Sequence, residues 1–263
     1  MGRKKSVFSG CATALITPFK NGEIDYISLE NLIDFQINNG ADAIVLLGTT
    51  GEASAISDGE RAECISFAKR KIQKRIPLIV GTGSNNTERA VRYSKNAEEL
   101  GADAVLVVTP YYNKASETGL TLHYKSIAKA VDLPIIIYNV PSRTGVNIPM
   151  KVYGALSKID NIVGVKEASG NITYVYELLS LYSSDFDVYS GNDDMILPIL
   201  TLGGKGAISV ASNIVPSYIH QLCAEFFHGN ISKSMEIQLY LRSLIKELFA
   251  EVNPIPVKTA SFR

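Results

Sequence analysis

The chain has 263 residues, 46% of them hydrophobic, which is enough for one large α/β domain or two small ones with a sizeable core. Its 26 basic and 26 acidic side chains cancel, so there is no electrostatic footprint for nucleic acid or an anionic membrane. No apolar run approaches the ~20 residues of a membrane-spanning helix, and no apolar stretch follows the basic residues 1–5 as in a secretory signal. We therefore expect a cytoplasmic protein with a short solvated leader.

The cysteines and histidines argue against disulfides and metal sites. The three cysteines are odd in number, far apart and without a CxxC pair: Cys11, Cys64 and Cys223. They predict buried thiols in a reducing compartment. The three histidines, at positions 123, 220 and 228, have no metal-ligand spacing, so we expect no metal.

Eight short apolar segments, each followed by a helical pattern, run along the chain. The predicted strands are 11–17, 42–47, 77–80, 103–108, 134–138, a segment from 162 with Lys166 at its carboxyl end, 186–189 and 206–210. The first two predicted helices begin at Ser28 and at a cap on Asp58. The other predicted helices are 87–100, 120–130, 149–157, 174–182, 195–202, 216–227 and 232–251.

The strands are continuously apolar rather than alternating, which is typical of a parallel sheet covered on both faces. Eight strand–helix units predict an α/β fold, a closed (β/α)₈ TIM barrel with additional C-terminal helices. An open doubly wound sheet is disfavoured, because Thr17-Pro18-Phe19 stands where its glycine fingerprint would follow the first strand. We assign residues 1–225 to the barrel and 226–263 to a helical segment of the same domain.

Lys166 lies at the carboxyl end of its predicted strand, where a barrel of this kind carries its catalytic groups. Burial lowers the pKa of a lysine and makes its neutral amine a nucleophile for carbonyl carbons. Considered alone, the stretch favours a lysine that extends to solvent and pairs with Glu167. Adjacent strand side chains point to opposite faces, however, so we expect Glu167 to lie outside the pocket.

Other strand ends carry polar groups suited to carbonyl chemistry. Thr49 and Thr50 stand between glycines, where exposed backbone N–H groups can hold a carboxylate, although a plain turn is an alternative. Tyr112 belongs to a pair of neighbouring tyrosines after a predicted strand. Such a pair can serve in a site, or it can simply pack at an interface. Tyr138 ends a strand as a proton donor and acceptor, and Arg143 can bind a carboxylate bidentately.

Six motifs run in order over nearly the whole chain: Gly48–Glu52, Thr109–Asn113, Tyr138–Gly145, Val165–Asn171, Ser190–Asp193 and Asn253–Lys258. With them the sequence resembles the dihydrodipicolinate synthase family of the pyruvate-dependent class I aldolases. The resemblance implies a lyase of lysine and diaminopimelate biosynthesis that condenses pyruvate with L-aspartate 4-semialdehyde. It implies no cofactor and a homotetramer built as a dimer of dimers, or a homodimer.

The resemblance also assigns the site residues. Lys166 is expected to form the Schiff base with pyruvate. Tyr138, Thr49 and Tyr112 are expected to relay protons, with Tyr112 reaching across a dimer interface.

Four further residues are expected to bind the substrates. Thr50 would hold the pyruvate carboxylate, and Arg143 would bind the carboxylate of the semialdehyde. Ile208 and Gly191 would complete the pyruvate pocket.

Two departures from the family pattern leave alternatives open. Where lysine-inhibited members place histidines and a glutamate, this chain has Asp58, Arg61 and Arg89, which predicts weak or absent feedback by lysine. The chain also ends at Arg263, where family members usually continue as further helices. The alternatives are a related enzyme such as N-acetylneuraminate lyase, which Arg143 argues against, or an inactive pyruvate-binding scaffold.

Overall fold

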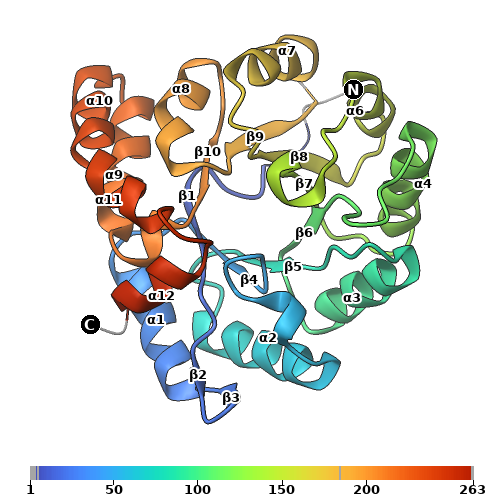
Figure 1. Cartoon of the computed structure of the whole chain (residues 1–263), viewed down its shortest axis with the longest axis horizontal. Helices are drawn as coiled ribbons and strands as arrows, with labels where there is room; N and C mark the ends of the chain where they lie inside the picture. The colour runs from blue at the N-terminus through green and yellow to red at the C-terminus, as the bar shows by residue number, and fades with distance from the viewer. Residues whose placement is uncertain (1–3, 5, 184, 262–263) are drawn as a thin grey trace.

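Eight parallel strands close into a barrel inside a ring of helices (Figure 1). The computed structural model describes residue 4, residues 6–183 and residues 185–261. Strand β1 pairs with both β4 and β10, which closes the barrel and confirms the predicted (β/α)₈ architecture. The barrel strands are β1 (Gly10–Ala14), β4 (Ala43–Leu46), β5 (Leu78–Gly81), β6 (Ala104–Val108), β7 (Ile135–Asn139), β8 (Ile162–Glu167), β9 (Asp187–Ser190) and β10 (Gly206–Ser209).

The helices surround this barrel and continue beyond it. A hairpin of β2 (Phe19–Lys20) and β3 (Glu23–Ile24) follows β1, and three short 3₁₀ turns are η1 (Ala53–Ala55), η2 (Asp193–Met195) and η3 (Ala211–Asn213). The helices are α1 (Tyr26–Asn38), α2 (Asp58–Ile72), α3 (Thr87–Glu99), α4 (Glu117–Ala128), α5 (Pro141–Thr144), α6 (Met150–Leu156), α7 (Ile172–Tyr182), α8 (Ile196–Thr201), α9 (Pro216–Phe227), α10 (Ile231–Tyr240), α11 (Arg242–Leu248) and α12 (Ile255–Ser261).

Several predicted helix boundaries were wrong for local reasons. The helix expected from Ser28 begins at Tyr26, because the Asp25 side chain accepts the backbone N–H groups of residues 27 and 28. The helix expected over 232–251 is two helices, α10 and α11, which meet at Leu241. Neither α5 nor α12 was predicted, since each is short and carries no clear apolar period.

The predicted cap of α2 on Asp58 was also wrong. Ser57 caps the helix, and its hydroxyl accepts the N–H of Glu60 while the Glu60 carboxylate accepts the N–H of Ser57 at 2.9 Å. This capping box satisfies two backbone donors at once. Asp58 is left as the first residue of α2, and its carboxylate is free to bind side chains of α3.

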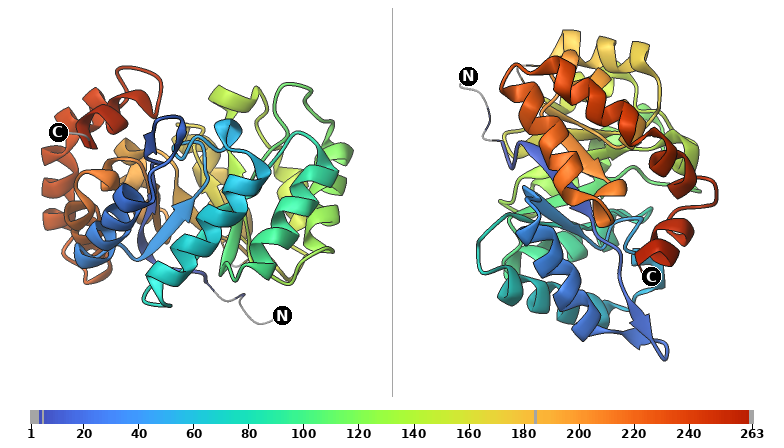
Figure 2. Two further views of the ribbon diagram at one scale, coloured as in Figure 1. Left: turned by 90° about the horizontal axis from the view of Figure 1, so that it is seen from below. Right: turned by 90° about the vertical axis from the view of Figure 1, so that its left-hand side faces the viewer.

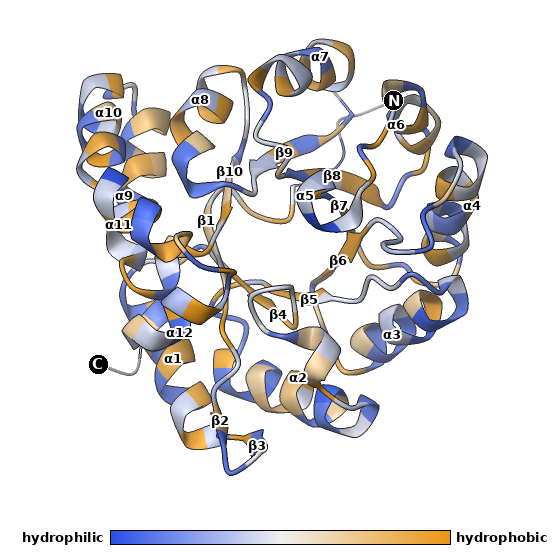
Figure 3. Cartoon of the chain, in the orientation of Figure 1, coloured by the Kyte–Doolittle hydropathy of each residue, from blue (hydrophilic) through white to orange (hydrophobic). Residues whose placement is uncertain are grey.

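Side chains alternate between the barrel interior and the helices, as a period of two requires. On β4, Ala43 and Val45 join the interior cluster, whereas Ile44 and Leu46 join the cluster that packs against the helices. In Figure 3 the strands are largely hydrophobic and the helices carry a hydrophobic face toward them. The same alternation decides which residues of β8 can reach the barrel mouth.

Lys4 corrects the expectation of a solvated leader. Its ammonium donates to the carbonyl oxygens of Ser157, Ile159 and Ile162 at 2.8, 2.6 and 2.7 Å. The first two carbonyls follow the end of α6, where helix carbonyls lack partners and a cation is favoured. Residues 1–3 and 5 lie outside the described residues.

The C-terminal segment returns to the barrel mouth. The expected boundary at 225/226 falls inside α9, and α10 and α11 then lead to α12 (Figure 2). The Lys258 ammonium lies 2.5 Å from the Glu52 carboxylate in the loop after β4. This contact ties α12 to the loop that carries Thr49 and Thr50.

The thiols of Cys11, Cys64 and Cys223 are free and buried, as predicted. Over the described part of the chain, no helix has the length and apolar character to cross a membrane. Within those same residues, His, Cys, Asp and Glu side chains form no group of three that could hold a metal ion.

The pairing of β1 with β10, which we call the seam of the barrel, brings Gly10 opposite Gly206. Gly206 has a φ of +146°, and a Cβ there would lie 1.9 Å from the carbonyl oxygen of Gly10 on the paired strand. Gly206→Ala should lower the free energy of unfolding by about 3 kcal/mol or more, measured by urea denaturation.

Gly203→Ala is the matched control. Gly203 also has a positive φ, +104°, but no heavy atom lies within 4 Å of the position that a Cβ would take there. The substitution should cost only the backbone strain, about 1–2 kcal/mol. Equal losses in the two variants would contradict the account of the seam.

Candidate active site

Lys166 lies inside the mouth of the barrel. It follows Val165, which packs outward against the helices, so its own side chain points inward. The residue is only 5% exposed, and its Nζ lies 4.4 Å from the centre of the Tyr138 ring. Burial lowers the pKa of Lys166 to about 8, while the Asp193 carboxylate opposes this shift and the Arg143 guanidinium adds to it.

Glu167 lies on the opposite face of β8 and does not neutralise this lysine. Its carboxylate accepts the Asn139 side-chain N–H at 2.8 Å and the Ser169 backbone N–H at 2.6 Å. Asn139 stands directly beside it on β7. The prediction that Glu167 lies outside the pocket is confirmed, and pairing of Lys166 with Glu167 is wrong.

Tyr138 stands beside Lys166 across the β7–β8 pair. Burial raises the pKa of its hydroxyl, and this rise is opposed by a hydrogen bond with Thr49 and by the charge of Arg143. The structure therefore brings three predicted residues together at the ends of β4, β7 and β8. A neutral phenol and a threonine hydroxyl beside a buried amine can pass protons to and from a reacting group.

Asn253 holds both predicted carboxylate-binding side chains. Its side-chain amide donates to the Thr50 hydroxyl at 3.0 Å, and its backbone carbonyl accepts from the Arg143 guanidinium at 3.0 Å. Thr50 follows β4 and Arg143 lies in α5. Asn253, which precedes α12, therefore joins two sides of the barrel mouth. Sequence reasoning found the motif 253–258 but predicted no role for this asparagine.

Gly191 and Ile208 are the remaining two predicted substrate-binding residues. A Cβ on Gly191 would lie 3.1 Å from Lys166 Cε and 2.6 Å from the Cβ of Ala168, so only glycine fits. Ile208 is fully buried in the interior cluster that contains Tyr138 and Ala168. The missing side chain of Gly191 therefore leaves room for the Lys166 side chain.

Tyr112 is a predicted site residue that lies on the surface of this chain. It is 92% exposed and its φ is +66°, a conformation that costs a non-glycine residue about 1–3 kcal/mol. Its neighbour Tyr111 lines the cleft beside Tyr138 instead. The Tyr112 ring is therefore open to solvent in the single chain.

A cleft of about 420 Å³ opens beside Tyr138. Its lining runs from the loop after β4 to α2, α3 and α5. The lining includes Leu47, Thr49, Ile56, Arg61, Arg89, Tyr93, Leu106, Val108, Tyr138, Val140 and Arg143.

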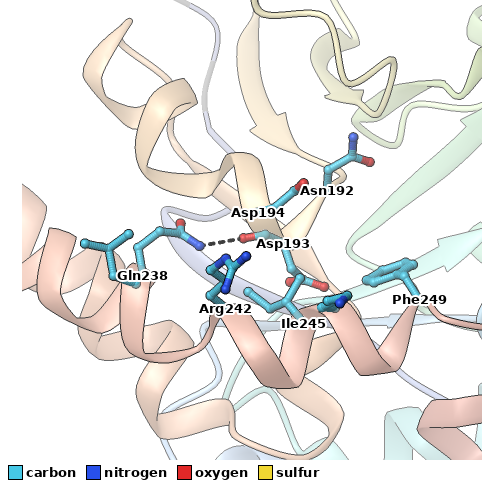
Figure 4. A pocket seen from close by; sticks show the side chains of 9 residues that line it. Asn192, Asp193, Asp194, Gln238, Arg242, Ile245 and Phe249 are labelled. Carbon is cyan, nitrogen blue, oxygen red and sulfur yellow. Dashed lines mark hydrogen bonds between the residues drawn. The ribbon is translucent and has the colours of Figure 1, made fainter.

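A larger cavity, of about 720 Å³, lies outside the barrel between the turn after β9 and helices α10 and α11 (Figure 4). There the Gln238 side chain donates to the Asp193 backbone carbonyl at 3.0 Å. The cavity is lined by Asn192, Asp193, Asp194, Gln238, Leu239, Arg242, Ile245, Lys246 and Phe249. Lys166 is not among these residues, so cavity size does not identify the reactive site.

Asp193 is a functional candidate for which sequence reasoning predicted no role. Its buried carboxylate accepts the Ser209 hydroxyl and the N–H groups of Val210 and Ala211, the latter two at 3.0 Å. Burial raises the pKa of Asp193, and these hydrogen bonds oppose the rise. Its negative charge favours the protonated form of Lys166 and so limits the lowering of that pKa.

Comparisons with known proteins agree with this geometry. The Dihydrodipicolinate synthetase family model matches residues 7–262. The 4-hydroxy-tetrahydrodipicolinate synthase of Alkaliphilus oremlandii (strain OhILAs) is 52% identical over 254 residues, which are 97% of this chain and 88% of that protein.

Solved structures agree as well. Dihydrodipicolinate synthase from Aquifex aeolicus superposes with a TM-score of 0.95 at 46% identity, covering 97% of this chain and 87% of that one. The enzyme from Thermotoga maritima also gives a TM-score of 0.95, at 47% identity, with coverage of 97% and 88%.

The position of Asp193 generates a prediction. Asp193→Asn removes the negative charge that favours the ammonium, so the pKa of Lys166 should fall below about 8. The variant should also lose about 1–3 kcal/mol of stability, because an amide offers one acceptor oxygen to three donors. Competitive acetylation of Lys166 as a function of pH, followed by mass spectrometry, measures the pKa.

Asp194→Asn is the control, since Asp194 is an exposed neighbour that makes none of these contacts. It should leave the Lys166 pKa unchanged. An unchanged or raised pKa in Asp193→Asn would show that this carboxylate does not act on the lysine.

Proposed function

Because the chain belongs to the dihydrodipicolinate synthetase family, we propose that it condenses pyruvate with L-aspartate 4-semialdehyde through a Schiff base on Lys166. The activity is that of 4-hydroxy-tetrahydrodipicolinate synthase, a lyase of the class I aldolase type in lysine and diaminopimelate biosynthesis. The observation that carries the mechanism is a buried lysine with a pKa of about 8 beside a buried tyrosine.

The lowered pKa supplies the nucleophile. With a pKa of 8, about one lysine in ten is neutral at pH 7, against about three in ten thousand at the ordinary pKa of 10.5. The neutral amine of Lys166 adds to the ketone carbon of pyruvate and forms a carbinolamine. Loss of water then gives the protonated imine, in which the carbonyl carbon is bonded to Nζ.

Proton transfers follow at the same place. Carbinolamine collapse needs a proton delivered to the leaving hydroxyl, and enamine formation needs one removed from the methyl carbon. Tyr138 is placed to carry these protons, with Thr49 hydrogen-bonded to it. We propose Tyr112 of a neighbouring subunit as the third member, since its exposure and strained backbone suit a residue that is fixed by an interface.

Two polar groups and an apolar wall hold the substrates. Thr50 is proposed to bind the pyruvate carboxylate, with Ile208 and Gly191 enclosing the carbon skeleton beside Lys166. Arg143 is proposed to bind the carboxylate of the semialdehyde. Asn253 contacts Thr50 and Arg143 alike and keeps the two groups at a constant separation.

Carbon–carbon bond formation then requires no external cofactor. The enamine carbon attacks the aldehyde carbon, and the aldehyde oxygen takes up a proton. The amine of the second substrate next attacks the imine carbon and displaces the Lys166 amine. Ring closure therefore releases the enzyme and the cyclic dicarboxylate together.

The alternatives are less well supported. N-acetylneuraminate lyase would accept a sugar, and the arginine after β7 suits an acid instead. An inactive scaffold has no need of a desolvated amine, whose burial costs stability. We also propose a homodimer or a dimer of dimers, because Tyr112 can contribute only from another chain.

Turnover of the two candidate second substrates tests the proposal. Purified protein with pyruvate should consume L-aspartate 4-semialdehyde and not N-acetylmannosamine. Arg143→Gln should raise KM for the semialdehyde about 100-fold, the loss of a charge-assisted hydrogen bond worth about 3 kcal/mol. Steady-state kinetics with each substrate varied in turn makes the measurement.

The matched control is Arg92→Gln, an exposed arginine of α3 away from Tyr138 and Lys166. It should leave both KM values within about twofold, as surface substitutions usually do. Turnover of N-acetylmannosamine without turnover of the semialdehyde would refute the assignment.

A further inference from the structure

Glu167 is a buried carboxylate that the proposed reaction does not use. It is 1% exposed, and no lysine, arginine or histidine among the described residues forms an ion pair with it. Burial raises the pKa of Glu167, and its hydrogen bonds with Ser169 and Asn139 oppose the rise. A buried carboxylate without a counterion costs free energy unless hydrogen bonds replace its lost water. These two contacts are therefore what hold Glu167 in place.

Asn139 uses both ends of its side-chain amide to join three segments. Its Nδ2 donates to the Glu167 carboxylate at 2.8 Å and to the Asn147 side-chain oxygen at 2.7 Å. Its Oδ1 accepts the backbone N–H of Ile148 at 3.2 Å. Asn139 is fully buried, where hydrogen bonds are stronger than in water. One amide thereby links the end of β7, the end of β8 and the segment before α6.

The contacts with residues 147–148 close the loop that carries Arg143. This loop leaves β7 at Asn139, passes through α5 and returns to the same asparagine. Inside the loop, the Thr144 hydroxyl lies 3.0 Å from the carbonyl oxygen of Val146. Because both ends of the loop meet at one buried amide, Arg143 is held at a constant position relative to the end of β7.

Strands β7 and β8 lie side by side and end together (Figure 1). Tyr138 of β7 stands opposite Lys166 of β8, and one residue further along Asn139 stands opposite Glu167. There the backbone N–H of Ala168 donates to the Asn139 carbonyl oxygen at 2.9 Å. Cross-strand side-chain pairs stabilise a sheet, so the bond between the two outward side chains resists any sliding that would separate the inward pair.

The charge of Glu167 also acts on Tyr138. Burial is the main cause that raises the pKa of Tyr138, and the Glu167 carboxylate adds to the rise. The pKa of Lys166, by contrast, is set by burial, Asp193 and Arg143. Glu167 therefore favours the protonated phenol, which can donate a proton, and leaves the reactivity of the amine to other groups.

We propose that Asn139 and Glu167 form a positioning pair, which holds Tyr138 against Lys166 and anchors the loop of Arg143 from the outer face of the barrel. The role rests on the proposed function, because it concerns the same amine and the same proton relay. Neither side chain points into the barrel mouth, so both act through the residues that precede them. A misplacement of reacting groups by about 1 Å can cost about 100-fold in rate.

Steady-state kinetics of Glu167→Gln tests the proposal. The amide has nearly the same size, but it offers one acceptor oxygen to the two N–H donors that the carboxylate satisfies. The kcat should fall about 10- to 100-fold. The KM for pyruvate should change by less than about threefold, as expected for a residue that does not bind the substrate. Borohydride with pyruvate should still place one adduct on Lys166.

An exchanged pair, Asn139→Asp together with Glu167→Gln, should restore kcat to within about threefold of the unaltered protein. The carboxylate at position 139 then accepts from the amide at position 167, whose oxygen still accepts the N–H of Ser169. The Asn147 amide can turn to donate to the same carboxylate. Glu177→Gln is the matched control, the same substitution at an exposed position of α7, and should leave kcat within about twofold.

Two results would overturn the proposal. One is a kcat for Glu167→Gln within twofold of the unaltered protein. The other is an exchanged pair that is folded by circular dichroism but has a kcat no higher than Glu167→Gln alone.

Should the exchanged pair not fold, the single variant decides. Loss of the pyruvyl adduct of Glu167→Gln in proportion to its kcat would mean that Glu167 acts on stability alone, which also contradicts the proposal. Unaltered protein that gains no adduct would instead refute the proposed function and this role with it, so the two failures are distinguishable.

Discussion

The cost of burying one ammonium governs the structure around Lys166. The folded-state pKa of about 8 lies below the ordinary value of 10.5, so the folded protein holds its proton less tightly than the unfolded chain. Folding is therefore penalised by about 3 kcal/mol below pH 8, and the penalty disappears as the pH rises through 10.5. The surrounding barrel has to supply that energy, and in return the amine becomes a nucleophile near neutral pH.

The barrel supplies it by packing and by distributing charge. Glu167 is directed outward to Asn139, so no carboxylate in contact restores the ordinary pKa. Asp193 acts from a distance, held by two backbone N–H groups that follow β10, and limits the shift in the Lys166 pKa. The reactivity of the lysine is thus a balance between burial and one buried charge, set by strands on either side of it.

The sequence predicted the parts that follow from period and composition, and missed those that depend on contacts across the chain. Continuous apolar segments revealed every barrel strand, and strand alternation placed Lys166 inside and Glu167 outside. Asn253 could not be predicted, because its contacts with Thr50 and Arg143 span 203 and 110 residues. Lys4 was likewise misjudged, since its contacts with carbonyls more than 150 residues away are invisible in a local pattern. The place of Tyr112 depends on a second chain and stays a prediction.

The central claim is that the buried amine of Lys166 captures pyruvate, and borohydride trapping tests it most directly. Protein incubated with pyruvate and sodium borohydride should gain one reduced pyruvyl group, which peptide mass spectrometry should place on Lys166. The yield at short times should rise with pH through about 8, because only the neutral amine reacts. Folded protein that gains no adduct, or that gains it on another lysine, would contradict the account.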